Sequence, residues 1–126
     1  MIEISEPLPG SEPGYKSLHE VRLDGKYIGY IDVGYMRKGD IKMFKGIMKG
    51  KLKRELKIGQ PFGVQLFIDS AKSGVSASEL GEGGIRKILE VMRSKFEGLE
   101  DRDVSILELN IEKKKILGRA DKFQVR

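Results

Sequence analysis

The sequence predicts an α+β domain with a single mixed, mostly antiparallel sheet and one long helix packed on it. Short stretches with the pattern of strands lie within 18–35, 64–69 and 104–111. Two longer stretches, 40–56 and 84–96, instead repeat their apolar residues at helical spacing. The chain has 126 residues, of which 39% are hydrophobic, and this is enough for one domain with its own core.

The first elements expected are a short strand and a hairpin. Within the irregular segment 1–14, three prolines and two glycines follow residue 5, so only Ile2–Ser5 is compatible with a strand. The stretch 18–23 then alternates, and a second strand rich in aromatic and β-branched residues follows at 27–35. Between them Asp24–Gly25 is a typical two-residue hairpin turn.

A basic helical insertion is predicted after the hairpin, over residues 37–57. Asp40 is a suitable N-cap, and apolar side chains follow it at helical spacing. Gly46 and Gly50 each cost about 1 kcal/mol relative to alanine, which favours a broken or frayed helix. The apolar stripe consists of Ile41, Phe44, Met48 and Leu52.

A short apolar strand is expected at Val64–Asp69 and is a candidate for the centre of the sheet. Turn residues precede it, and Pro61 forbids the continuation of a helix there. The polar stretch 70–78 is predicted to be a loop. A last strand is expected over 104–111, and no element is assigned to the basic tail 113–126.

A glycine-rich stretch precedes the long helix. Ser76 and Glu79 match a capping box, so one helical turn is expected at 77–80 before the glycines break the chain. Free N–H groups at the next helix start can bind an anion, and glycines let a phosphate approach the backbone. Glu82 would repel a phosphate, and the stretch matches neither a P-loop nor a dinucleotide fingerprint. An ordinary connection is therefore the alternative interpretation.

The long helix itself has a clear apolar face. It is expected to begin near Gly84 or Ile85, and Gly98 is placed to end it. The spacing of its apolar residues is i, i+3, i+4, i+7 and i+11, which puts them on one side of a helix. These residues are Ile85, Ile88, Leu89, Met92 and Phe96.

The composition restricts the chemistry. The absence of cysteine excludes disulfides, thiolate metal sites and thiol nucleophiles, and a single histidine excludes a His-based zinc cluster. That histidine, His19, falls on the apolar side of its strand, which indicates packing rather than catalysis. Few Asn and Gln beside many Lys and Glu is typical of thermophile proteins. No apolar run could span a bilayer, and the acidic start with its prolines does not resemble a secretory signal, so a soluble cytoplasmic protein is expected.

The positive charge of the chain is concentrated in one segment. The net charge is +5, yet residues 37–57 hold nine Lys/Arg against Asp40 and Glu55, which makes +7 and leaves −2 for the rest. One hypothesis is that this segment binds nucleic acid, with Tyr35 and Phe44 available for stacking; the alternative is a lysine-rich surface over a core stripe. The cations proposed to contact phosphates are Arg37, Lys38, Lys42, Lys45, Lys49, Lys53 and Arg54.

In chain order, four stretches resemble the GNAT (Gcn5-related N-acetyltransferase) superfamily. They are HEVRLDGKYIGYIDV at 19–33, VQLFIDSAKSG at 64–74, GEGGIRKILEVM at 81–92 and DVSILELNIE at 103–112. The resemblance implies a domain that binds acetyl-CoA or another acyl-CoA and acetylates an amine, either a small molecule or a protein. A purely nucleic-acid-binding protein without enzymatic activity remains the alternative, and a second copy of the chain is a further partner that the sequence leaves open.

The resemblance also implies roles for particular residues. Backbone groups of Phe67, Ile68 and Ser70 would pair with the pantetheine arm in a gap between the strands 64–69 and 104–111 and polarise the thioester carbonyl. Amides near Gly81, Gly83 and Gly84 would hold the pyrophosphate, although Gly74 also lies at a suitable distance after its strand. Asp69 and Glu108 are the candidate bases. The family's late tyrosine is absent, and Phe123 stands near its place, so catalytic activity stays an open question.

Overall fold

The described chain forms one six-stranded sheet in which neighbouring strands follow one another in sequence. A computed structural model describes residues 1–48, 57–99, 103–111 and 114–120. The strands are β1 (Ile2–Ile4), β2 (Lys16–Leu23), β3 (Lys26–Tyr35), β4 (Pro61–Asp69), β5 (Val104–Leu109) and β6 (Lys114–Arg119). The helices are α1 (Lys38–Met48), α2 (Ser70–Ser73) and α3 (Ala77–Lys95). Neighbouring strands are antiparallel except β4 and β5, which are parallel, so the predicted α+β fold with a mixed sheet is confirmed.

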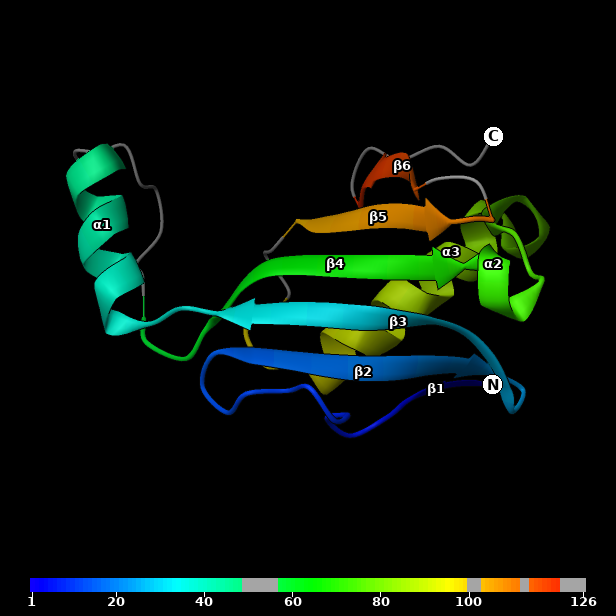
Figure 1. Ribbon diagram of the computed structural model, residues 1–126, viewed down its shortest axis with the longest axis horizontal. Helices are drawn as coiled ribbons and strands as arrows, with labels where there is room; N and C mark the ends of the chain where they lie inside the picture. The colour runs from blue at the N-terminus through cyan, green and yellow to red at the C-terminus, as the bar shows by residue number, and fades with distance from the viewer. Residues whose placement is uncertain (49–56, 100–102, 112–113, 121–126) are drawn as a thin grey trace.

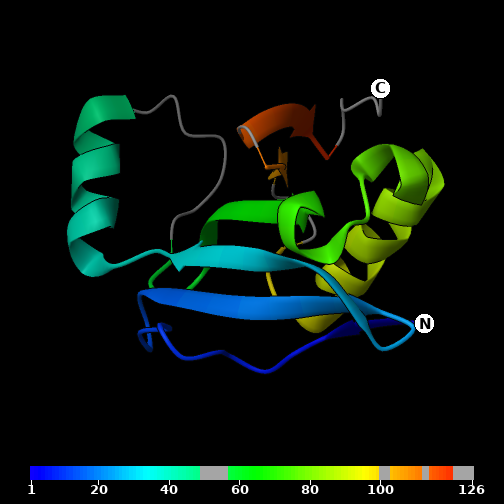
Figure 2. The same cartoon turned by 45° about the vertical axis from the view of Figure 1, so that its right-hand side comes forward.

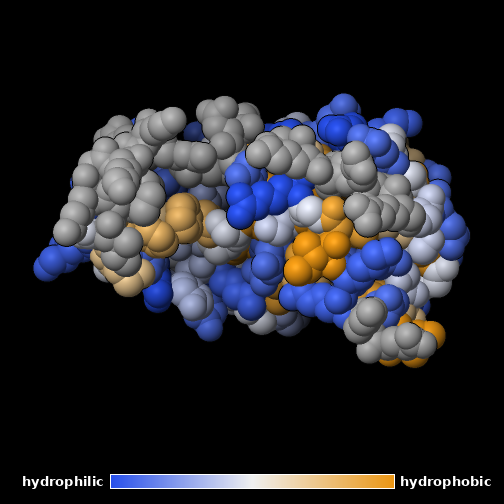
Figure 3. All heavy atoms as spheres, turned by 90° about the horizontal axis from the view of Figure 1, so that it is seen from above, coloured by the Kyte–Doolittle hydropathy of each residue, from blue (hydrophilic) through white to orange (hydrophobic). Residues whose placement is uncertain are grey.

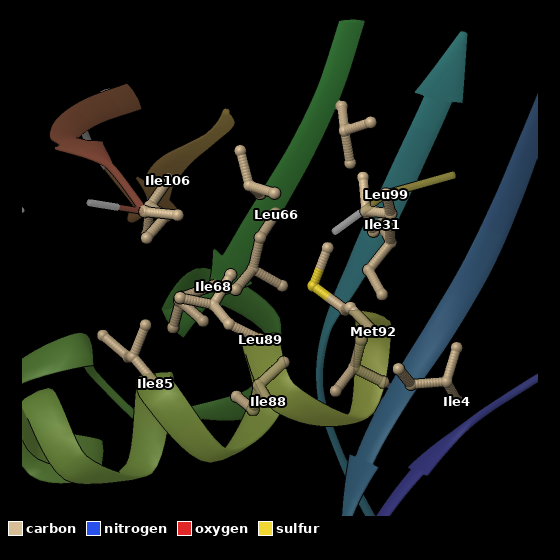
Figure 4. Packing of buried hydrophobic residues seen from close by; sticks show 14 of the residues in the cluster. Ile4, Ile31, Leu66, Ile68, Ile85, Ile88, Leu89, Met92, Leu99 and Ile106 are labelled. Atoms are coloured by element: carbon tan, nitrogen blue, oxygen red, sulfur yellow. The ribbon is translucent and has the colours of Figure 1, made fainter. Parts of the chain in front are cut away.

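Helix α3 packs on one face of the sheet and builds the core. Two parallel strands need a crossover connection, and α3 supplies it from β4 to β5, behind the sheet in Figure 1. Its predicted apolar face is confirmed, since Ile85, Ile88 and Leu89 point toward Leu66 and Ile68 of β4 (Figure 4). Burying such side chains contributes about 1.5–3 kcal/mol each, which fixes the helix across the strands.

The opposite face of the sheet, here called the open face, has no described helix across it. It is turned toward the viewer in Figure 1, where α1 lies beyond one end of the strands and α2 at the other. Figure 2 shows the same arrangement from a second direction. Strand alternation, together with the β-bulge where the β2–β3 register shifts between Val21 and Arg22, brings mostly aromatic and polar side chains to this face: Lys16, Leu18, Glu20, Tyr27, Tyr30, Asp32, Gln65 and Phe67.

The predicted hairpin is confirmed, and its turn has the backbone conformation expected for Asp24–Gly25. Leu23 pairs with Lys26, and Asp24 and Gly25 have φ angles of 50° and 82°. Positive φ at both central residues is the signature of the turn type that suits a tight hairpin. The short N-terminal strand is also confirmed at Ile2–Ile4.

Several predicted boundaries were wrong because long-range pairing decides them. β4 begins at Pro61 rather than Val64, since Pro61 pairs with Tyr35, and proline is tolerated as the first residue of a strand. The predicted loop at 70–78 starts with the one-turn helix α2. The unassigned basic tail contains β6, which pairs with β5, and β5 ends at Leu109 rather than at residue 111.

The ends of the two longer helices also differ from the prediction. α1 begins at Lys38, and Asp40 accepts a hydrogen bond from the Arg37 N–H (3.0 Å), so Asp40 caps from inside the first turn. The same bond holds the pKa of the Asp40 carboxyl below its usual range. α3 ends at Lys95, and Gly98 (φ 83°) lies in the turn that follows. Helix α1 runs through Gly46 without a break; Gly50 and Leu52 of the predicted insertion lie outside the described residues.

The β6 edge mixes apolar and charged surface. Figure 3 looks onto this edge and shows hydrophobic patches between hydrophilic side chains. Within β6, Ile116 is 75% exposed and the adjacent Lys115 is also exposed. Charged side chains on an edge strand hinder its pairing with other chains.

Candidate functional site

The start of α3 is built in two steps, as the capping box and the glycines predict. The Ser76 side chain accepts a hydrogen bond from the Glu79 N–H (3.1 Å), and the Glu79 side chain reaches back to the Ser76 backbone. At Gly81 the helix breaks, with φ 74° and ψ 167°. Only glycine adopts this backbone readily. A second helical start therefore follows Gly81.

Gly83 and Gly84 follow the break in helical conformation, and the fold does not demand glycine at either. A Cβ added to Gly83 would meet nothing within 4 Å, and one on Gly84 would make an ordinary 3.5 Å contact with Leu80. Glycine in a helix costs about 1 kcal/mol relative to alanine, so the fold gains nothing from Gly83. The first N–H groups of a new helical start lack helical acceptors and attract anions. Close approach of an anion to the backbone is a physical reason for an exposed glycine here.

Cations accompany this helix start. Arg86 donates from Nη2 to the Glu82 carboxylate at 2.8 Å, and from Nε to the same oxygen at 3.2 Å. The charge of Glu82, which was expected to repel a phosphate, is thus offset by a neighbour one turn on. Lys87 is exposed beside this pair.

Gly74 has a different task. It is the left-handed cap of α2 (φ 75°), and its N–H donates to the Ser70 carbonyl. Of the two glycine positions that the sequence left open, the fold therefore explains Gly74 as a cap, whereas it does not explain Gly83.

The carboxyl ends of β4 and β5 are closed rather than splayed. The two strands pair in register from Val64↔Val104 to Asp69↔Leu109, without a shift. Beyond the last pair, the Ser70 hydroxyl donates to the Leu109 carbonyl at 2.8 Å. The structure therefore places Phe67 and Ile68 inside a continuous ladder, and both are buried. The backbone groups expected to pair with a pantetheine arm do not line a gap.

The two candidate bases, Asp69 and Glu108, are not brought together. Asp69 Oδ1 accepts from the Lys72 N–H (3.1 Å) and Oδ2 from the Tyr27 hydroxyl (2.6 Å), so Asp69 caps α2 and holds a tyrosine. Glu108 lies opposite Lys115 in the β5–β6 register. It directly precedes Leu109, which lies opposite Asp69 in the β4–β5 register. Successive strand residues point to opposite faces, so the two carboxylates lie on opposite sides of the sheet.

Tyrosines on the open face form a cluster that sequence reasoning missed. The Tyr30 ring stacks on Phe67 with a centroid distance of 4.6 Å and an interplanar angle of 15°. Burial and then the Asp69 hydrogen bond and charge raise the pKa of Tyr27 well above its usual range. Burial and then the charges of Asp69 and Asp32 raise the pKa of Tyr30. The period-two pattern of residues 27–35 was the available signal, because it puts Tyr30 and Asp32 on one face.

The basic segment is partly described. Arg37, Lys38, Lys42 and Lys45 are exposed, and the last three follow one face of α1 at i, i+4 and i+7, whereas Lys49, Lys53 and Arg54 lie outside the described residues. Arg37 lies over the Tyr15 ring at 4.2 Å and pairs with Asp40. The two expected stacking residues have partners within the protein: Phe44 packs on Phe62 (4.9 Å), and the Tyr35 hydroxyl is 2.8 Å from Ser17 Oγ.

His19 is buried, as its place on the apolar side of the strand predicts. Its Nδ1 lies 2.8 Å from the Ser5 carbonyl and its Nε2 lies 2.8 Å from Ser17 Oγ. The ring also meets Phe96 edge-on at 4.7 Å. His19 therefore links β2 to the N-terminal segment and to the end of α3.

The described residues contain neither a cluster of metal ligands nor a helix that could cross a membrane. No group of three or more His, Asp or Glu in this part of the chain lies close enough to hold a metal ion. None of the described helices is long and apolar enough to cross a membrane. Comparisons of the chain with protein-family models, curated proteins and solved structures found no match.

Proposed function

We propose that the chain binds an acyl-CoA, with the cofactor's pyrophosphate on the backbone amides of residues 81–84, and that it serves acyl transfer to an amine. The observation that carries this proposal is Gly83, an exposed helical glycine at a helix start where the fold has room for a side chain. The site also has a suitable position. The helix that starts there joins two parallel strands, and ligands of such sheets bind outside the carboxyl ends of the strands.

Acyl transfer requires a further step at the sheet. For the pantetheine arm to enter between β4 and β5, the pairs Ile68↔Glu108 and Asp69↔Leu109 must separate. The proposal therefore divides into anchoring of the diphosphate, which needs no rearrangement, and insertion of the arm, which needs this opening. ADP has the diphosphate but no pantetheine arm, so its binding tests the anchoring alone.

A second candidate function is nucleic-acid binding by α1. It is favoured by the exposed row of Lys38, Lys42 and Lys45, which spans about 10 Å at 1.5 Å per residue. Such a row can neutralise successive phosphates without base recognition.

The primary test is calorimetric titration of the wild-type protein with CoA, acetyl-CoA and ADP. Gly83→Ala should stabilise the protein by about 1 kcal/mol and weaken the binding of all three ligands, because a methyl group now stands where the phosphate approaches. The opposite signs of these two effects separate a functional glycine from a structural one. Gly83→Asp should abolish binding, since it adds a negative charge.

Gly46→Ala is the matched control. Gly46 is also a helical glycine with nothing within 4 Å of an added Cβ, but it lies in α1. It should stabilise the protein without changing CoA affinity. Absence of heat with millimolar CoA, or equal CoA affinity in wild type and Gly83→Ala, would overturn the proposal.

A further inference from the structure

The open face contains a hollow of about 500 Å³ next to α2. Leu8 and Leu18 give it aliphatic surface, because the segment before β2 runs beside that strand and the Leu8 N–H donates to the Leu18 carbonyl (2.8 Å). Tyr27 and Tyr30 of β3 supply aromatic surface, and Lys72 of α2 borders the hollow. Stacking on Phe67 fixes the Tyr30 ring.

Carboxylates surround the two tyrosines. Glu20 lies opposite Tyr30 in the β2–β3 register, and Asp32 is two residues further along β3 on the same face. Asp69 accepts the hydrogen bond of the Tyr27 hydroxyl. Burial and then the negative charges of Asp69 and Asp32 raise the pKa of Tyr30. Three carboxylates thus lie around the two phenols against two ammonium groups, Lys16 and Lys72, so the side chains here carry a net negative charge. A negative potential disfavours a phosphate in this hollow and favours a cation.

Two ammonium groups of the chain already occupy positions that a cationic ligand would use. Lys72 Nζ lies 4.9 Å from the centroid of the Tyr27 ring, within the range of a cation–π contact. Lys16 Nζ lies 3.8 Å from Asp32 Oδ2, a loose ion pair whose side chains are 40% and 28% exposed. Such partly exposed pairs contribute little stability and exchange readily with a competing cation.

We propose that this hollow binds a primary alkylamine, with its ammonium group at Asp32 and Tyr30 and its alkyl chain against Leu8 and Leu18. An amine is the acceptor class that the proposed acyl transfer needs, so this inference deepens the proposed function and, as an acceptor site, rests on it. Binding of the amine itself is independent of the start of α3, which packs against the opposite face of the sheet, and can be measured without CoA.

The experiment is a titration of the full chain followed by amide NMR shifts, with hexylamine as probe and hexan-1-ol as the uncharged probe of equal length. Hexylamine is protonated at pH 7, as a lysine side chain is. We expect it to bind at least tenfold more tightly than hexan-1-ol and to shift the amides of residues 16–20 and 27–32. Asp32→Asn, which keeps the shape of the side chain, should bring hexylamine down to the affinity of the alcohol.

Lys72→Met provides a change of opposite sign. It removes a positive charge that borders the hollow at Tyr27 and repels a bound ammonium group, so hexylamine affinity should rise severalfold. Lys115→Met, which changes an exposed lysine of β6, is the matched control and should leave the hexylamine affinity unchanged. Equal binding of hexylamine and hexan-1-ol, or unchanged affinity in a folded Asp32→Asn variant, would overturn the inference. Amine binding without CoA binding would remove the proposed function alone, and CoA binding without amine binding would remove this inference alone.

Discussion

Replacement of Gly29 by alanine should be strongly destabilising, because β3 and β4 approach each other closely at this position. Gly29 pairs with Ile68. A Cβ at Gly29 would lie 1.9 Å from the Phe67 carbonyl oxygen and 3.0 Å from its carbon. Real Cβ atoms essentially never come within 3.0 Å of such an atom, so the two backbones must move apart by about 1 Å or more.

The loss in the free energy of unfolding has two sources, overpacking between the strands and a weakened aromatic stack. Overpacking in a well-packed interior costs about 1–3 kcal/mol. Moving Phe67 away from Tyr30 also weakens an aromatic stack worth about 0.5–1.5 kcal/mol. We therefore expect a loss of about 2–4 kcal/mol from a free energy of unfolding that is about 5–15 kcal/mol for a domain of this kind. Gly29→Ala should stay folded at 25 °C with a Tm lower by roughly 10 °C.

Urea unfolding followed by circular dichroism measures this loss, and two other glycines calibrate it. At Gly34 the added Cβ would lie 2.9 Å from the Phe62 carbonyl oxygen, so a shift of a few tenths of an ångström relieves it. Gly34→Ala should cost about 1 kcal/mol, and Gly83→Ala should stabilise the protein. If Gly29→Ala were no less stable than Gly34→Ala, the close approach of β3 to β4 would be refuted.

Two further predictions concern charge. The raised pKa values of Tyr27 and Tyr30 mean that both tyrosines ionise in the unfolded chain, near pH 10, before they do so in the folded protein. The unfolded state then binds fewer protons, so the free energy of unfolding should fall as the pH rises above 10, and urea unfolding of Tyr27→Phe should show a smaller fall. Reversal of Lys38, Lys42 and Lys45 to Glu should lower the salt slope of any duplex DNA binding by about 2.7, that is about 0.9 for each cation, in a two-salt gel shift. Reversal of Lys26, Lys87 and Lys115 makes the same charge change elsewhere; an equal effect would contradict a site on α1.

Elements with a complete local signal could be predicted from the sequence. The stripe from Ile85 to Phe96 specifies which face of α3 is buried without reference to the rest of the chain. Asp24–Gly25 encodes its turn, and Ser76 with Glu79 encodes a helix start. Each of these signals lies within a few residues, so tertiary contacts strengthen it rather than decide it.

Elements defined by distant partners could not be predicted. β6 is a basic stretch with few apolar residues, and it becomes a strand because β5 offers it an edge. The hollow on the open face combines Leu8 with residues of β2, β3 and α2, so its existence depends on strand register. The role of Asp69 was missed for the same reason: its hydrogen-bond partner Tyr27 is 42 residues away in the chain.

The closed end of the β4–β5 ladder should lower the affinity for the arm of acetyl-CoA. An arm that enters there must break the last two backbone pairs and the bond from Ser70 to Leu109. At about 0.5–1.5 kcal/mol each, these bonds would reduce the affinity for acetyl-CoA by about 2–4 kcal/mol relative to a site that is already open.

Ser70→Ala removes one of these bonds and leaves the start of α3 intact. It should therefore raise acetyl-CoA affinity by up to about tenfold, while ADP, which has no arm, binds as before. Ser105→Ala is the control, because Ser105 lies at the amino end of β5, far from the hydrogen bond between Ser70 and Leu109. If acetyl-CoA and ADP gained equally, or neither changed although both bind, the arm would not enter between β4 and β5. Any acyl transfer would then have to proceed along the surface of the sheet.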